Sequence, residues 1–506
     1  MTANGVSSRR FVNLSVLALV SLCCLIWGLN SRQRVDFSSP SLAANRGSST
    51  EDFSAEIDKI KAQAQTRPDH FVVMLSGNWQ GRMEPCGCAE GMLGGIDRRT
   101  FLIDAVPAPQ RLLLDIGSLV GSDILPTHFE AFLYSLKQLN YDAISLTPME
   151  LRMLKKRGIA KTDFPPLVVT NLTKEASKAS TSSVSCLEKK LQSGDHTLDS
   201  LVLGVAEFGR VSGEGEKSAL TEPVGSVKEA LESKNIDPNK PSAGKFVILL
   251  TASQDGKFID SLRAIRALDL IVCRDFGDEP EVLSKQGQSP LVVTVGNQGK
   301  YMTRLDIPFS AEGAAAKKHL RAIPIREIYP KDKAVMTIMQ DYLDSLMIEA
   351  VIAEEKLPRK SLPSGNMFVG SETCASCHES QYEVWQTMAH SHALTTLIEK
   401  PELNGRQFDP RCVRCHSVGM DYFGGYRSMD DTPELAHVGC EQCHGPSDQH
   451  AFAEDPAAVE MRAPFMRCVE CHDAENDPNF EKDYKAKFDK IKHWKGKRNP
   501  LWHPNP

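Results

Sequence analysis

The chain has 506 residues, of which 41% are hydrophobic and 25% are charged, the proportions of an ordinary globular protein with more than one core. Its net charge of −6 and the lack of a basic stripe exclude a surface built to bind nucleic acid. The 14 cysteines are unusual, because eight of them fall in regularly spaced pairs between Cys374 and Cys471, which a disulfide framework does not produce.

The first feature along the chain is an uncharged apolar run from Phe11 to Leu29, preceded by Arg9 and Arg10. As a helix it would be about 28 Å long, close to the thickness of the membrane core. A cleaved signal peptide is the alternative, but the small residues Ser41 to Ala43 lie too far beyond the run for its cleavage site. We interpret residues 1–30 as an uncleaved signal anchor, which is a transmembrane helix, and the polar residues 31–65 as a flexible tether.

Residues 66–330 alternate short β-branched runs with helical patterns. The strand-like runs are FVVMLSG, RLLLDIG, DAISLT, PLVVTNL, LVLGVAEF, FVILLTAS, LDLIVC and PLVVTVG. Helical patterns such as FEAFLYSLKQLN and FIDSLRAIRAL lie between several of them. This alternation predicts an α/β layer fold with helices on both faces of the sheet. We expect the Ser- and Lys-rich residues 176–195 to form an excursion loop.

An amphipathic helix over 331–355 and the stretch LPRKSLPSGN mark a domain boundary, so residues 331–365 are predicted to connect two domains. Beyond it, residues 366–506 contain no strand-like runs and too little aliphatic sequence for a conventional core. We therefore predict a mostly helical and irregular domain whose interior is filled by something other than side chains.

Four C-x-x-C-H units in this region carry the clearest chemical signal. The pattern is the attachment signature of c-type haem, in which two thiols bind the haem covalently and the adjacent imidazole ligates iron. A zinc site or a redox dithiol would not require a histidine after every second cysteine. The sequence thus predicts four covalently attached haems. The units are Cys374, Cys377 and His378; Cys412, Cys415 and His416; Cys440, Cys443 and His444; Cys468, Cys471 and His472.

Several stretches resemble the tetrahaem cytochrome c-554 family over about residues 366–495. They are GSETCASCHESQYEVWQTMAHSHAL, RCVRCHSVGMDYFGGY, VGCEQCHGPSDQH and RCVECH followed by FDKIKHW. The resemblance implies that His390, His450 and His493 are distal iron ligands. His437 stands where the family often has no histidine and is a weaker candidate, and His392 is weaker still, although its spacing makes it a rival to His390. In that family one haem can remain five-coordinate, which leaves chemistry on a small nitrogen compound open.

The order of landmarks in residues 66–330 resembles calcineurin-like metallophosphatases, especially the 5′-nucleotidase branch. Those enzymes hold two metals with Asp, His and Asn on loops that follow strands. This chain departs from the pattern at the ligand positions, where Trp, Met and Pro cannot replace imidazole and carboxylate. We predict a scaffold that has lost its metals. The residues at those positions are Asn78 to Gln80, Gly117 and Ser118, Thr147 to Glu150, Thr251 to Ser253, and Arg274 to Gly277.

Cys86 and Cys88 lie on a Pro- and Gly-containing loop, too close together for an unstrained disulfide. They either form a thiolate metal site or a redox contact with a haem, or they are incidental to a loop that glycines shape.

Together these patterns predict a membrane-anchored, multidomain tetrahaem cytochrome c that exchanges electrons with redox partner proteins. Because c-type haem is attached outside the energy-transducing membrane, the bulk of the chain is expected in the periplasm. The first alternative is an oxidoreductase acting on a small nitrogen or sulfur compound at a five-coordinate haem. The second is residual phosphoesterase or nucleotide-binding activity in the α/β part.

Overall fold

The computed structural model describes residues 69–493 except 86–91, 122–124, 158–163, 180–182, 208–218, 276, 286, 310–318, 355, 363–364, 400–401, 456–457, 459–464, 474–475 and 478. The predicted anchor, the whole of the predicted tether, and Cys86 and Cys88 lie outside these residues. None of the helices that are described combines the length and the apolar character needed to cross a membrane.

The α/β part contains two mixed sheets. The first has seven strands in the order β12 (His319–Pro324), β11 (Tyr301–Pro308), β1 (His70–Ser76), β2 (Arg111–Asp115), β3 (Ala143–Ile144), β4 (Leu167–Val168) and β5 (Ser183–Val184). The second has five, in the order β10 (Leu291–Thr294), β9 (Leu270–Cys273), β8 (Lys245–Thr251), β7 (His196–Val205) and β6 (Leu187–Ser193). Strands β1 to β5 run parallel, and β11 and β12 join them antiparallel at one edge.

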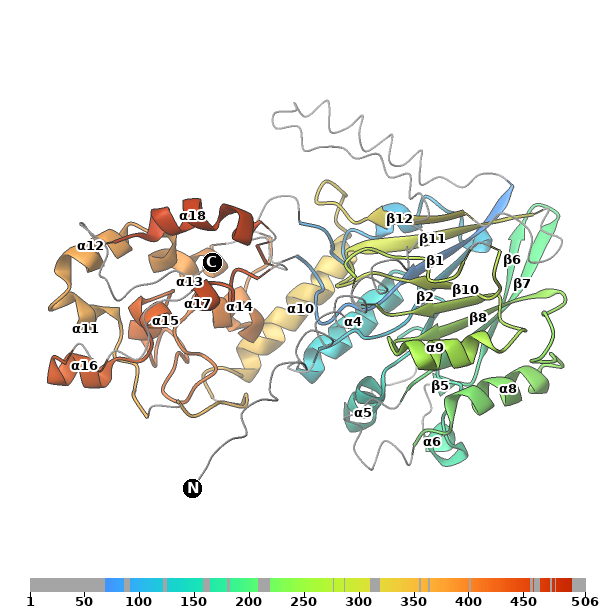
Figure 1. Cartoon of the computed structure of the whole chain (residues 1–506), viewed down its shortest axis with the longest axis horizontal. Coiled ribbons are helices and arrows are strands. Elements are labelled where there is room, and N and C mark those ends of the chain that lie inside the picture. Colours follow the sequence, from blue (N-terminus) through green and yellow to red (C-terminus); the bar gives the residue numbers. More distant parts are fainter. Residues whose placement is uncertain are drawn as a thin grey trace, which may run out of the picture.

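The two sheets pack face to face, with helices on the outside of each (Figure 1). Along β1, Phe71, Val73 and Leu75 join the core between the sheets, whereas Val72 and Met74 join the outer core. Helices α4 (Pro126–Gln138) and α10 (Lys333–Glu349) contribute to that outer core, and α8 (Pro223–Ser233) and α9 (Gly256–Arg263) cover the second sheet. Each sheet therefore has helices on one face only, because its other face is buried against the partner sheet. The expectation of helices on both faces of one sheet was wrong in this respect.

The expected excursion loop over 176–195 is also wrong, because it contains β5, β6 and the end of α6 (Lys174–Ala179). In β6 the apolar Leu187 and Leu191 point inward, while Glu188 and Lys190 between them are exposed. This alternation is a strand pattern, but the many charged residues obscure it. The eight predicted strand-like runs, by contrast, all contain strands of the structure.

Helix α10 connects the two parts and also belongs to their shared core. Asp332 caps its start by accepting hydrogen bonds from the N–H groups of Ala334 and Val335. Its buried face packs against α4, and the same apolar cluster continues to Leu397 and Val413 beyond the predicted boundary. The segment predicted as a connector is therefore a structural element of both parts.

The C-terminal part is built from short helices joined by irregular chain. They are α11 (Ser371–Ala375), α12 (Glu379–Gln386), α13 (Ala393–Ile398), α14 (Pro410–His416), α15 (Cys440–His444), α16 (Asp448–Ala453), α17 (Phe465–Cys468) and α18 (Phe480–Ile491). The first cysteine of each C-x-x-C-H unit lies in a helix of its own, in α11, α14, α15 or α17. This keeps the two thiols and the following imidazole of each unit within one or two helical turns.

Candidate haem-binding site

Three of the four C-x-x-C-H histidines lie opposite a second histidine ring. His378 faces His450 with ring centroids 6.1 Å apart. His472 faces His390 at 6.2 Å, and His444 faces His493 at 6.1 Å. Two metal–nitrogen bonds of roughly 2 Å, plus the distance of about 1.1 Å from each ring centre to its nitrogen, give about 6.2 Å. The pairs therefore have the spacing of two imidazoles on opposite sides of one metal ion.

In His450 and His493, two of the facing histidines, Nδ1 forms a hydrogen bond to a backbone carbonyl. Nδ1 of His450 lies 2.9 Å from the carbonyl of Asp455, and Nδ1 of His493 lies 2.9 Å from the carbonyl of Ile491. Because a carbonyl only accepts, Nδ1 carries the proton and Nε2 keeps its lone pair for a metal.

Two C-x-x-C-H histidines are oriented in the same way. Nδ1 of His416 donates to the carbonyl of Ala393 at 2.5 Å, and Nδ1 of His472 bonds to the Asp477 carboxylate at 3.0 Å. In a third, His444, burial and then the neighbouring His493 and His378 lower the pKa to about 4. These rings are thus held in states that can bind a metal ion.

His416 differs from the other three motif histidines. In the part of the chain that is described, no second histidine ring lies opposite it. His437, the remaining predicted ligand, instead faces His392 at 6.5 Å. The N–H of Leu394 donates to Nδ1 of His437 at 3.1 Å, which places the proton of the neutral ring on Nε2 and leaves no free lone pair for iron. The geometry brings His390, His450 and His493 to motif histidines, but not His437.

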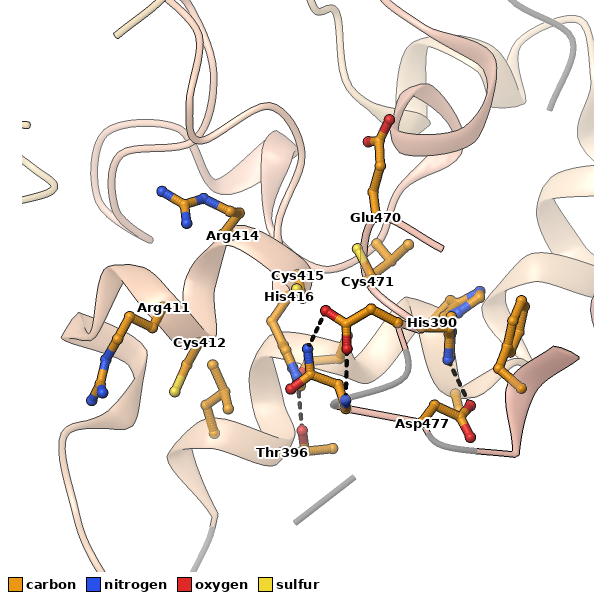
Figure 2. Close-up of a pocket in the computed structure, with 18 of the residues that line it drawn as sticks. His390, Thr396, Arg411, Cys412, Arg414, Cys415, His416, Glu470, Cys471 and Asp477 are labelled. Atoms are coloured by element: carbon orange, nitrogen blue, oxygen red, sulfur yellow. Dashed lines mark hydrogen bonds and ion pairs between the residues drawn. The ribbon is translucent and has the colours of Figure 1, made fainter. Parts of the chain in front are cut away.

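A cavity of about 1960 Å³ connects the second and fourth motifs (Figure 2). Its lining includes Cys412, Cys415, His416, Cys471 and His472. A pocket for a single drug-sized ligand has about 300–1,000 Å³, so this space suits more than one large cofactor. None of the eight motif cysteines forms a disulfide, which leaves their sulfur atoms available for covalent attachment. The thiols, imidazoles and space together fit c-type haem.

The residues predicted to stand at metal-ligand positions in the α/β part also lie near one another, at the carboxyl ends of its strands. The N–H of Asn78 donates to the carbonyl of Gly117 at 2.8 Å, which joins the loops after β1 and β2. The side-chain amide of Gln80 donates to Oδ1 of Asn78 and to Oδ1 of Asn297, each at 3.0 Å. The amide oxygens of Asn78 and Asn297 are thus already bonded to Gln80, and neutral amides lack the negative charge with which carboxylates bind hard dications.

Two buried carboxylates at the same edge hold loops in place. Asp115 accepts hydrogen bonds from Ser76, from the indole of Trp79 and from the N–H of Gly117. Glu150 accepts from the N–H groups of Thr147, Ser118, Leu119 and Val120. Burial raises the pKa of both carboxyls, and these bonds oppose the rise. The described residues contain no group of three or more His, Cys, Asp or Glu placed to hold a metal ion.

The comparisons with known proteins agree with this division. Residues 373–445 match the family model for cytochrome c554 and c-prime. The C-terminal part resembles cytochrome c-554. Cytochrome c-554 of Nitrosomonas europaea is 36% identical over 98 residues, which are 17% of this chain and 42% of that protein. The dissimilatory sulfite reductase of Wolinella succinogenes is 40% identical over 45 residues, 9% of this chain and 6% of that protein. The chain thus spans less than half the length of either relative.

For the α/β part, one similar solved structure is the 5′-nucleotidase precursor of Thermus thermophilus. It has a TM-score of 0.43 and 16% identity, and the match covers 60% of this chain and 63% of that one. This similarity concerns the fold alone.

We expect elemental analysis of the purified protein to find iron but no further pair of metal ions per chain, because amides and Trp79 occupy the ligand positions. Hydrolysis of nitrophenyl phosphate should stay at the background rate with added Mn²⁺ or Zn²⁺. Two non-haem metals per chain together with turnover would restore the phosphoesterase alternative.

Sequence reasoning missed two residues that support the site. Arg411, next to Cys412, donates to the carbonyl of Gly81 and to His128 of the α/β part, and Asp477 orients His472 within the C-terminal part. Arg411 and Asp477 stand beside motif residues in the sequence, but their partners become visible only in the fold.

Proposed function

We propose that this protein is a membrane-anchored multihaem cytochrome that transfers electrons through four covalently attached haems on the outer side of the cytoplasmic membrane. The observation that supports this best is the set of three facing histidine pairs, at 6.1, 6.2 and 6.1 Å. Bound haem supplies one-electron chemistry, and two imidazole ligands favour electron transfer because they fill both axial positions.

Cysteines of different motifs lie close enough to shift each other's pKa, which supports an order for the transfer. The thiols of Cys374 and Cys440 and those of Cys471 and Cys415 interact directly, whereas Cys468 acts electrostatically on Cys443. The motifs thus form a row in the order first, third, fourth and second. The row starts at Cys377, which is exposed, and ends at α14, near α10 and the α/β part (Figure 1). We propose that redox partner proteins exchange electrons at the exposed first motif.

The proposed anchor rests on the apolar run from Phe11 to Leu29. The full chain should sediment with membranes and be accessible to protease from the periplasmic side, and removal of residues 1–30 behind a cleavable export signal should release it. A full chain that stays in the soluble fraction would contradict the anchor.

Potentiometric titration of the purified protein, with haem absorbance as the readout, tests the electron-transfer function. We expect four haems per chain by the pyridine haemochrome assay, all of them reversibly reduced in one-electron steps. A lower haem count, or haems that do not reoxidise, would contradict the proposal.

A second function is favoured by one specific observation, the lack of a facing histidine at His416 among the described residues. Its Nδ1–H is bound to the carbonyl of Ala393, so its Nε2 can serve as a single axial ligand. A small nitrogen or sulfur compound could then bind on the opposite side. We expect the ferric protein to bind one cyanide per chain. If it binds none, electron transfer remains as the only proposed function of the four haems.

A further inference from the structure

The cavity at the second motif has a wall that comes from the α/β part. Residues 80–85, from Gln80 to Pro85, line the same cavity as Cys412, Cys415 and His416. This segment follows β1 at the carboxyl edge of the sheet, the position of the former metal-ligand loop. The edge at which related folds place their metals is therefore turned toward the candidate haem site.

Arg411 joins this wall to the second motif. Its Nη1 donates to the carbonyl of Gly81 at 2.5 Å and to Nε2 of His128 at 2.9 Å. His128 lies on α4, is 1% exposed and stacks on Tyr342 of α10 at 4.8 Å. The Asp409 carboxylate binds the other edge of the guanidinium, so its planar fork is held from both sides.

Two other contacts attach the same segment to the C-terminal part. Nη1 of Arg82 donates to Oδ1 of Asn476 at 2.9 Å, in the loop between His472 and Asp477. Glu84 forms an ion pair with Arg406, just before the second motif. Residues 81–84 thus contact the surroundings of the second and fourth motifs, which both line the cavity.

We propose that the α/β part closes the chamber in front of His416 and that the bonds of Arg411 to Gly81 and His128 hold this wall in place. The α/β part then controls how fast a small ligand reaches the second C-x-x-C-H motif. This inference rests on the proposed ligand site at His416. In it Arg411 and His128 are positioning residues, because they act through the wall and not on the ligand.

The test is stopped-flow cyanide binding to the ferric full-length protein. His128→Phe keeps an aromatic ring between Phe132 and Tyr342 but removes the acceptor for Arg411, and Arg411→Lys keeps the charge but loses the fork. The matched control is Arg427→Gln, since Arg427 belongs to the same part of the chain, bonds to the carbonyl of Ala353 and is not among the residues that line the cavity. Haem content and circular dichroism of each variant show that it has folded.

We expect His128→Phe and Arg411→Lys to raise the association rate about tenfold, as expected for the loss of one charge-assisted hydrogen bond. Dissociation should accelerate equally, so that Kd is unchanged, which distinguishes a wall from a direct ligand contact. Arg427→Gln should stay within about a factor of two of the wild type.

Two results would overturn the inference while the ligand site stands. One is association rates equal to that of the control, and the other is a changed Kd with an unchanged association rate. A wild-type protein that binds no cyanide would instead contradict the ligand site itself, and the inference with it.

Discussion

Replacing His390 with alanine is expected to convert one low-spin ferric haem to the high-spin state. The His390 ring lies opposite His472 at 6.2 Å, and its removal leaves the fourth motif with a single axial imidazole. Electron paramagnetic resonance should therefore show one more high-spin haem per chain than the wild type. The change should also create a new cyanide site.

His392→Ala is the matched control, because His392 lies two residues further along the same short 3-10 helix, Ala389–His392. It faces His437, which belongs to no C-x-x-C-H unit, so its loss should leave the spin states unchanged. If His392→Ala gave the extra high-spin signal and His390→Ala did not, the assignment of the two histidines would be reversed.

Glu150→Ala should lower the stability of the α/β part by about 3–5 kcal/mol, because four backbone N–H groups lose their acceptor in a buried site. Urea unfolding followed by circular dichroism measures this loss. Glu150→Gln retains one side-chain oxygen and should lose less.

Glu229→Ala provides the control, since Glu229 is an exposed glutamate on α8 of the same part. Its effect should stay within about 0.5 kcal/mol. An equally small effect of Glu150→Ala would show that Glu150 does not hold the loops after β2 and β3.

The haem motifs could be predicted from the sequence because covalent attachment depends on local spacing, which the fold does not alter. The distal candidates His390, His450 and His493 came from resemblance. Their pairing with individual motifs depends on how distant segments pack, so only the structure supplies it. His437 shows the limit most clearly. As a histidine outside the motifs it was a candidate ligand, but the bond from the N–H of Leu394 engages the lone pair of its Nδ1.

The α/β strands were predictable because their β-branched runs are buried on both faces. The division of these strands into two facing sheets was not predictable. A β-branched run buried between two sheets and one buried under helices have the same sequence pattern. The contact of Arg411 with His128 joins residues 283 positions apart, and neither residue type signals such a partner.

The most direct test of the central claim is a quantitative spin-state census of the oxidised wild-type protein by electron paramagnetic resonance, normalised to its haem content. The structure predicts three low-spin haems with two imidazole ligands and one high-spin haem, held by His416. Four low-spin haems would show that another group closes the position opposite His416, whereas two or more high-spin haems would contradict the three histidine pairs.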